Sequence, residues 1–155
     1  MKIRELLRQG KTSLSFEVFP PKKDTDFANV ETATLSIAKL QPSYMSVTYG
    51  AGGSTKGNTI QLASEIQQKY NVPAISHLTC VCASKENIKA ALNEMKSAGI
   101  ENILALRGDI PANADFPLPD QYKHASELIA DIKAQGDFCI GGACYPEGHP
   151  EAATI

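Results

Sequence analysis

Residues 74–106 read AISHLTCVCASKENIKAALNEMKSAGIENILAL and contain one complete strand-helix-strand repeat. The short apolar runs at 74–80 and 102–106 predict the two strands. Between them, apolar residues at i, i+3, i+4 and i+7 predict an amphipathic helix, namely Ile88, Ala91, Leu92 and Met95. Ser84 is placed to cap the start of this helix and Gly99 to end it.

The same alternation runs through the rest of the chain. Further strands are predicted at 15–19, 44–48 and 139–145, with weaker helical patterns at 27–40 and 59–70. A last helical pattern precedes Gly136 and consists of Ala125, Leu128, Ile129 and Ile132. Residues near successive strand ends, Phe19, Tyr49, Thr79 and Asp109, are each 30 positions apart. About 30 residues is the length of one βαβ repeat.

Nearly continuous apolar strands, each followed by a helix, predict a parallel α/β sheet covered on its outer side. No GxGxxG pattern follows the first strand, so a doubly wound dinucleotide-binding sheet loses its best support. A (β/α)8 TIM-barrel type is favoured, with only about the first five strands present. Because eight units need about 200–250 residues, we expect residues 1–155 to form a single partial barrel domain.

Composition narrows the class of protein. The 155 residues are 43% hydrophobic and 21% charged, which is typical of one globular core. A net charge of -2 offers no electrostatic reason to expect nucleic acid or an anionic membrane as a partner. The first residues lack the apolar stretch of a signal peptide or spanning helix, and the four cysteines lie in or beside apolar runs. Reduced thiols and a cytoplasmic location are therefore expected.

Polar and unusual residues gather where the predicted strands end, which is where a barrel carries its chemistry. The segments are SFEVFPPK (15–22), TYGAGGST (48–55), HLTC (77–80), ALRGD (105–109) and YPEGHPEA (145–152). Each segment alone has a structural explanation, because prolines end strands and glycines turn the chain.

In their order and spacing, these five segments resemble the methylenetetrahydrofolate reductase family across nearly the whole chain. The resemblance implies a (β/α)8 barrel that binds FAD, accepts hydride from NAD(P)H and passes it to 5,10-methylenetetrahydrofolate, giving 5-methyltetrahydrofolate. It also implies a place in one-carbon metabolism and methionine biosynthesis.

The resemblance further assigns roles to residues. Glu17 matches the general acid, and Asp109 matches an aspartate near the flavin and the folate. The positions that match FAD contacts are Thr48, Tyr49, Ala51, His77, Arg107, Gly108, Asp109, Ala125, Tyr145, His149 and Ala152.

Chemistry gives a reason for these residue types. Opening the five-membered folate ring needs an acid at the departing nitrogen, and desolvation between Phe16 and Phe19 would favour protonated Glu17. A negative Asp109 would lower the reduction potential of a flavin and attract a cationic intermediate. The arginine fork of Arg107 suits phosphate or ring oxygens.

Structural alternatives remain open for the same residues. Glu17 could simply cap a turn at a strand end, and Arg107 with Asp109 could be an ordinary surface ion pair. His77 could be a satisfied core histidine.

A metal site and an incomplete barrel are the competing functional interpretations. Zinc would need a cluster drawn from His77, Cys80, Cys82, Cys144 and His149. In a strand, however, Cys80 and Cys82 share one face while His77 points to the other.

An incomplete barrel would leave the first and fifth strands with an unpaired edge, which predicts self-association or a complementing chain. In that interpretation the chain is a barrel fragment without independent catalysis.

Overall fold

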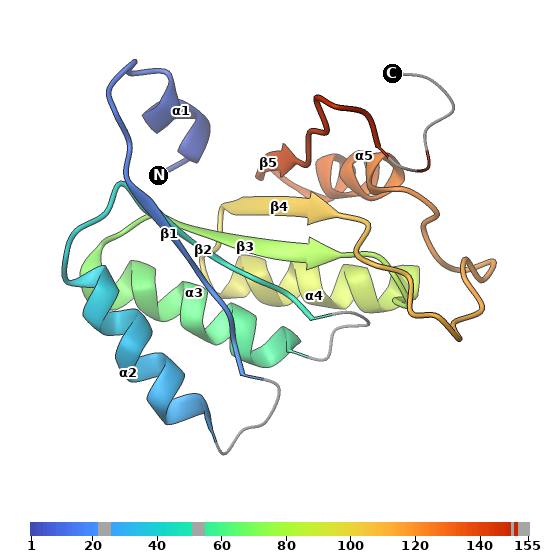
Figure 1. Ribbon diagram of the computed structural model, residues 1–155, viewed down its shortest axis with the longest axis horizontal. Coiled ribbons are helices and arrows are strands. Elements are labelled where there is room, and N and C mark those ends of the chain that lie inside the picture. Colours follow the sequence, from blue (N-terminus) through green and yellow to red (C-terminus); the bar gives the residue numbers. More distant parts are fainter. Residues whose placement is uncertain (22–25, 51–54, 150, 152–155) are drawn as a thin grey trace.

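Five parallel strands form one sheet in sequence order in the computed structural model, which describes residues 1–21, 26–50, 55–149 and 151 (Figure 1). The strands are β1 (Ser15–Val18), β2 (Tyr44–Val47), β3 (Ala74–Thr79), β4 (Asn102–Leu106) and β5 (Cys139–Gly142). Every neighbouring pair is parallel. The predicted parallel α/β architecture is therefore confirmed.

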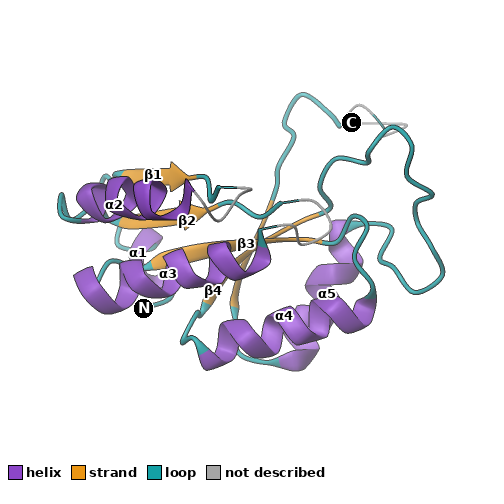
Figure 2. Cartoon of the chain, turned by 90° about the horizontal axis from the view of Figure 1, so that it is seen from below, coloured by secondary structure: helices purple, strands orange, loops and turns teal. Residues whose placement is uncertain are grey.

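Helices alternate with these strands. They are α1 (Ile3–Leu7), α2 (Phe27–Ala38), α3 (Lys56–Tyr70), α4 (Lys85–Ser97) and α5 (Ala125–Gln135). In Figure 1, α2, α3 and α4 lie along one face of the sheet, and Figure 2 shows α5 continuing this layer beside α4. None of the helices in the described part of the chain combines the length and apolarity needed to span a bilayer.

The α4 helix forms as the sequence predicts. The Ser84 hydroxyl accepts a hydrogen bond from the backbone N–H of Asn87 at 3.1 Å, which caps the first turn. Gly99 follows the helix with φ +74°, a left-handed conformation that glycine adopts without steric cost. The apolar stripe is fully buried, as expected: Ile88, Ala91, Leu92 and Met95.

The core lies between the sheet and the helical layer. Alternate strand residues such as Met45, Val47 and Leu78 are completely buried there against Leu62 and Ile66 of α3. Because side chains alternate along a strand, the residues between them point to the opposite, inner face. Glu17 and Ser46 are partners on that face.

The short helix α1 covers the N-terminal ends of the strands, and the sequence pattern did not predict it. The buried Asn102 side chain accepts from the backbone N–H of Ile3 at 2.9 Å. Its amide donates at 3.1 Å to the carbonyl oxygens of Met1 and Ala74. Five residues are too few to show a helical period, so α1 depends on this tertiary anchor.

Element boundaries differ from prediction most at β5. This strand ends at Gly142 rather than at residue 145, so Tyr145 lies in the following loop. Gly141 and Gly142 offer no side chains for packing, which weakens strand structure. At the other elements the differences are smaller: α2 ends at Ala38, and α3 begins at Lys56, three positions before the predicted start.

Candidate functional site

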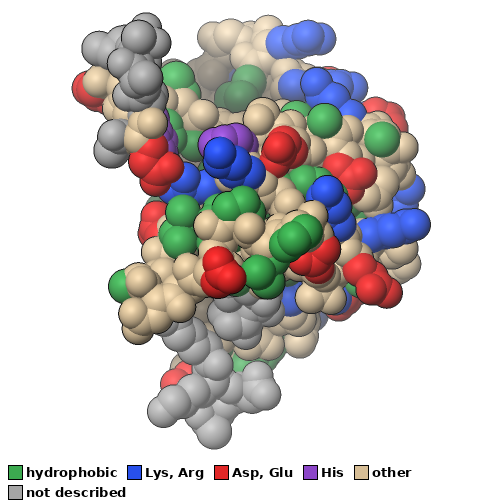
Figure 3. All heavy atoms as spheres, turned by 90° about the vertical axis from the view of Figure 1, so that its right-hand side faces the viewer, with side chains coloured by type: hydrophobic (Ala, Val, Ile, Leu, Met, Phe, Trp, Pro, Cys, Tyr) green, Lys and Arg blue, Asp and Glu red, His purple; other side chains and the backbone are tan. Residues whose placement is uncertain are grey.

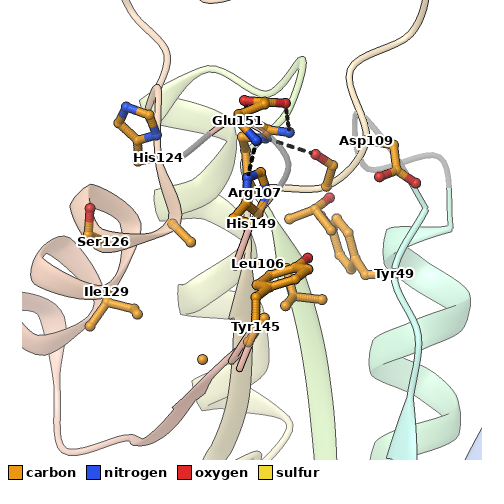
Figure 4. Close-up of a pocket in the computed structure, with 15 residues that line it drawn as sticks. Tyr49, Leu106, Arg107, Asp109, His124, Ser126, Ile129, Tyr145, His149 and Glu151 are labelled. Atoms are coloured by element: carbon orange, nitrogen blue, oxygen red, sulfur yellow. Dashed lines mark hydrogen bonds and ion pairs between the residues drawn. The ribbon is translucent and has the colours of Figure 1, made fainter. Parts of the chain in front are cut away.

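A cavity of about 800 Å³ opens where β3, β4 and β5 end. Most of the predicted cofactor residues line it: Tyr49, Arg107, Gly108, Asp109, Ala125, Tyr145 and His149. Figure 4 shows Tyr49 on one side of this cavity and the α5 side, with His124 and Ser126, on the other. Because the strands are parallel, their carboxyl ends meet at one edge and bring these distant motifs together.

Hydrogen bonds from α3 hold the loop after β2 that presents Tyr49. The Thr59 hydroxyl donates to the carbonyl oxygen of Thr48 at 2.8 Å, and the Thr55 hydroxyl accepts from the N–H of Gly50 at 2.8 Å. Burial, with a smaller contribution from the charge of Glu94, raises the pKa of Tyr49 to about 12. Its phenol therefore stays protonated at neutral pH and can donate a hydrogen bond into the cavity.

Arg107 forms a two-point ion pair with Glu151, a residue that the sequence analysis did not single out. The guanidinium Nη1 and Nη2 atoms lie 2.5 and 2.8 Å from the two carboxylate oxygens (Figure 4). These hydrogen bonds lower the pKa of Glu151 below its ordinary value. The pair joins the end of β4 to residue 151, so the ion-pair partner of Arg107 in the described residues is Glu151 rather than Asp109.

Gly108 brings the backbone after β4 close to β3. Its φ is +85°, and a Cβ built there would lie 2.7 Å from Val81 Cγ1 and 3.2 Å from Thr79 Cβ. No larger side chain fits in this conformation without displacing its neighbours. The glycine of ALRGD is thus required by packing as well as by backbone geometry.

Two aromatic rings form the β5 side of the cavity. Tyr145 and His149 meet edge to face, with ring centroids 4.7 Å apart. The Nδ1 atom of His149 accepts from the backbone N–H of Glu151 at 3.1 Å, which fixes the ring against the loop.

The helix α5 closes the cavity with its first turn. The Glu127 carboxylate accepts from the backbone N–H groups of Lys123 at 2.6 Å and His124 at 3.2 Å, which fixes the entry to the helix. His124, Ala125 and Ser126 consequently face the cavity from a helix N-terminus. Only Ala125 of these three was predicted, because the preceding loop carries no motif.

Charges of both signs lie around the opening. Figure 3 faces this end of the molecule and shows acidic and basic side chains interspersed beside histidine. Arg107 and Asp109 both line the cavity.

Glu17 lies on the inner face of the sheet, where it contacts His77. Its Oε2 atom is 3.3 Å from His77 Nε2 and accepts a hydrogen bond from the Ser46 hydroxyl at 3.0 Å. The histidine contact is close enough for electrostatic attraction but is not aligned as a hydrogen bond. Burial lowers the pKa of His77, and the nearby Glu17 charge partly opposes this shift.

The predicted burial of Glu17 between two phenylalanines is wrong. Its side chain is 46% exposed, and Phe19 is 68% exposed. Phe16 packs against the core on the helical face, because adjacent strand residues point to opposite sides. Desolvation by these rings therefore does not act on the carboxyl group.

Not every predicted site residue lines the cavity. Glu17, Thr48 and His77 are absent from its described lining. Ala51 and Ala152 lie outside the described residues. Over the described ranges, no three His, Cys, Asp or Glu side chains are grouped to hold a metal ion.

Two buried polar atoms on β3 have no hydrogen-bond partner within the described part of the chain. They are His77 Nε2 and Thr79 Oγ1. Thr79 also lines the cavity, although the sequence analysis did not select it. Its position two residues after His77 in HLTC, on the same face of a strand, was the available signal.

Comparison with known proteins identifies the family. The family model described as methylenetetrahydrofolate reductase matches residues 2–155. The chain is 41% identical to "Methylenetetrahydrofolate reductase 2" of Schizosaccharomyces pombe, over 98% of this chain and 25% of that protein. It is 37% identical to the "5,10-methylenetetrahydrofolate reductase" of Pectobacterium carotovorum, over 94% of this chain and 48% of that protein.

A plant relative shows the same partial coverage. "Methylenetetrahydrofolate reductase (NADH) 1" of Zea mays is 40% identical, over 97% of this chain and 26% of that protein. The chain thus spans about a quarter to a half of the length of these relatives. Because the family match covers nearly the entire chain, the protein belongs to the methylenetetrahydrofolate reductase family.

Proposed function

We propose that this chain contributes the flavin-binding and proton-donating part of an enzyme that reduces 5,10-methylenetetrahydrofolate to 5-methyltetrahydrofolate with NAD(P)H. The main support is the single cavity lined by Tyr49, Arg107, Asp109 and Tyr145, which come from three different loops. Its volume of about 800 Å³ lies within the roughly 300–1,000 Å³ typical of cofactor sites.

The residues around this cavity fit FAD. Arg107 lies in the lining, where its fork would serve phosphate or ring oxygens once it releases Glu151, and the N-terminus of α5 favours negative charge. Tyr49 and Tyr145 offer aromatic surface for a planar ring. When bound, FAD would carry hydride between the nicotinamide and the folate. A negative charge on Asp109 would lower the reduction potential of the flavin and attract a cationic intermediate.

Glu17 is the proposed proton donor to the folate nitrogen. Its exposure on the inner face of the sheet leaves the carboxyl group accessible to a substrate. The Ser46 hydroxyl and the His77 ring restrict its orientation. His77, with its lowered pKa, would be a neutral neighbour of this carboxyl group.

The fold proposal follows from the open sheet. Parallel strands in sequence order, each followed by an outer helix, match the first part of a (β/α)8 barrel. We therefore propose that residues 1–155 form one partial barrel domain, with NAD(P)H and folate contacts shared with the remaining part of such a barrel.

The test separates cofactor binding from proton donation. The chain is titrated with FAD, the bound flavin is reduced anaerobically, and its reoxidation by 5,10-methylenetetrahydrofolate is followed by flavin absorbance. Glu17→Gln is expected to slow this reoxidation by about 100-fold or more while FAD affinity stays unchanged. Reoxidation of the variant at the wild-type rate would remove Glu17 from the mechanism.

The matched control is Glu86→Gln, which changes an exposed glutamate in the first turn of α4. This variant is expected to bind FAD and to reoxidise like the wild type. A wild-type chain that binds no FAD would refute the proposed cofactor site itself.

A second candidate is a fragment without independent catalysis, completed by another chain or by self-association. The supporting observation is that, among the described strands, β1 and β5 each have a neighbour on one side only. Flavin binding without folate-dependent reoxidation in the wild type would favour this candidate.

A further inference from the structure

Thr79 is the last residue of β3 and one of the few buried polar residues in the sheet. Its side chain is only 5% exposed, yet it lines the cavity. Its Oγ1 atom has no hydrogen-bond partner in the described residues. A buried hydroxyl without a hydrogen-bond partner lowers the stability of the folded chain. A hydroxyl at a cavity wall can instead find its partner in a bound ligand.

The neighbouring backbone does not supply that partner. Thr79 is paired in register with Leu106 on β4. The Leu106 carbonyl oxygen already accepts from the N–H of Cys80, and the Arg107 carbonyl oxygen accepts from the N–H of Val81. Gly108 packs on the other side of the threonine, where an added Cβ would lie 3.2 Å from Thr79 Cβ. The cavity is the direction left for a partner.

The surroundings of Thr79 differ from those of the charged residues. Leu106 and Tyr49 line the same cavity with apolar and aromatic surface. Arg107 is engaged by Glu151, and His124 lies at the N-terminus of α5. A planar ring suits the first environment, whereas the N-terminus of α5 favours negatively charged groups.

We propose that the Thr79 hydroxyl hydrogen-bonds the polar edge of the isoalloxazine ring and so positions the flavin against β3. This inference rests on the proposed function, because it needs a flavin in the cavity. It adds a ring contact that lies outside the set of residues implied by the family resemblance.

The test compares Thr79→Val with Thr79→Ser. Valine keeps the branched shape and suits a strand but lacks the hydroxyl, whereas serine keeps the hydroxyl. Each chain is titrated with riboflavin, FMN and FAD, and binding is followed by quenching of flavin fluorescence. The three probes share the ring and differ in their phosphates.

Thr79→Val is expected to weaken binding of all three flavins by about three- to tenfold, the effect of one neutral hydrogen bond. Thr79→Ser should stay within about twofold of the wild type. Without flavin, Thr79→Val should melt no lower than the wild type, because the hydroxyl it removes has no partner in the protein. A loss of flavin affinity without a loss of stability is the expected signature.

Three results would overturn the inference. Wild-type affinity of Thr79→Val for every flavin would show that the hydroxyl makes no contact with them. A loss confined to FAD would place the contact at its phosphates or adenosine. A lower melting temperature without flavin would show a partner within the protein. Failure of the wild type to bind any flavin would instead refute the proposed function, and this inference with it.

Discussion

Gly108 occupies a backbone conformation and a space that exclude other residues. At φ +85°, an alanine Cβ would be strained and would lie 2.7 Å from the fully buried Val81 side chain. Gly108→Ala is expected to lower the free energy of unfolding by roughly 2–4 kcal/mol. Urea denaturation monitored by circular dichroism provides the measurement.

Gly57 is the matched control, because it lies within α3 and a Cβ there meets nothing within 4 Å. Gly57→Ala should raise the free energy of unfolding by up to about 1 kcal/mol, since alanine favours the helix. Equal effects of the two substitutions would contradict the packing role assigned to Gly108.

The burial of His77 predicts how the free energy of unfolding depends on pH. Burial lowers its pKa in the folded chain below the ordinary value of 6.5. As the pH falls below 6.5, the unfolded chain takes up a proton before the folded chain does. The free energy of unfolding should therefore fall in this window, and the loss is complete once the folded-state pKa is passed. Well above pH 6.5, His77 is neutral in both the folded and the unfolded chain and contributes nothing to the pH dependence of stability.

The measurement compares flavin-free wild type with His77→Gln by urea denaturation between about pH 7.5 and pH 5. The variant should lose less stability across this range. Asn93→Gln, which changes an exposed residue of α4 that does not titrate, should keep the pH dependence of the wild type. The prediction fails if His77→Gln and wild type have parallel pH profiles.

At the level of elements, α1 depends on a side chain of a distant strand. Asn102 is 1% exposed and bonds the backbone of Ile3, Met1 and Ala74. Asn102→Ala leaves buried backbone groups unpaired and should cost roughly 2–4 kcal/mol of unfolding free energy. Denaturation in urea tests this, with protease cleavage near residue 8 as a second readout of α1 release.

Asn93→Ala is the control, because Asn93 is exposed within α4 and alanine is a good helix former. It should cost no stability and should not expose α1 to protease. A similar loss in both variants would argue against a specific anchor at Asn102.

Helices and strands with a strong local sequence pattern are predicted correctly, and those with a weak pattern are predicted less well. The α4 helix has a complete stripe, a capping serine and a terminal glycine, and it forms as predicted. The end of β5 was misplaced because the sequence CIGGACY looks apolar throughout, whereas Gly141 and Gly142 contribute no packing. For α1, stability comes from Asn102, which no local pattern reveals.

For the whole molecule, the sheet leaves two outer strands with one described neighbour each. Leu14, Phe19 and Leu40 are 63%, 68% and 71% exposed, and the first two flank β1. Unpaired backbone beside apolar side chains favours association between chains. We expect the average mass in sedimentation equilibrium to rise with concentration over the micromolar range.

Phe19→Lys should shift this equilibrium toward the monomer, because a charge beside the β1 edge opposes pairing. Leu118→Lys is the control, since Leu118 is 41% exposed in the loop between β4 and α5. A wild type that stays monomeric throughout, or equal effects of both substitutions, would rule out the β1 edge as the contact.

The order of the five strands and of helices α2 to α5, the parallel sheet and the family follow from the sequence alone, because they depend on local periodicity and on short motifs such as HLTC and ALRGD. Tertiary structure alone decides which side chains meet. Arg107 pairs with Glu151, 44 positions away, and Glu17 faces His77 rather than two phenylalanines. Such contacts depend on strand register and on which face each residue occupies, and a shift of one residue would exchange the faces.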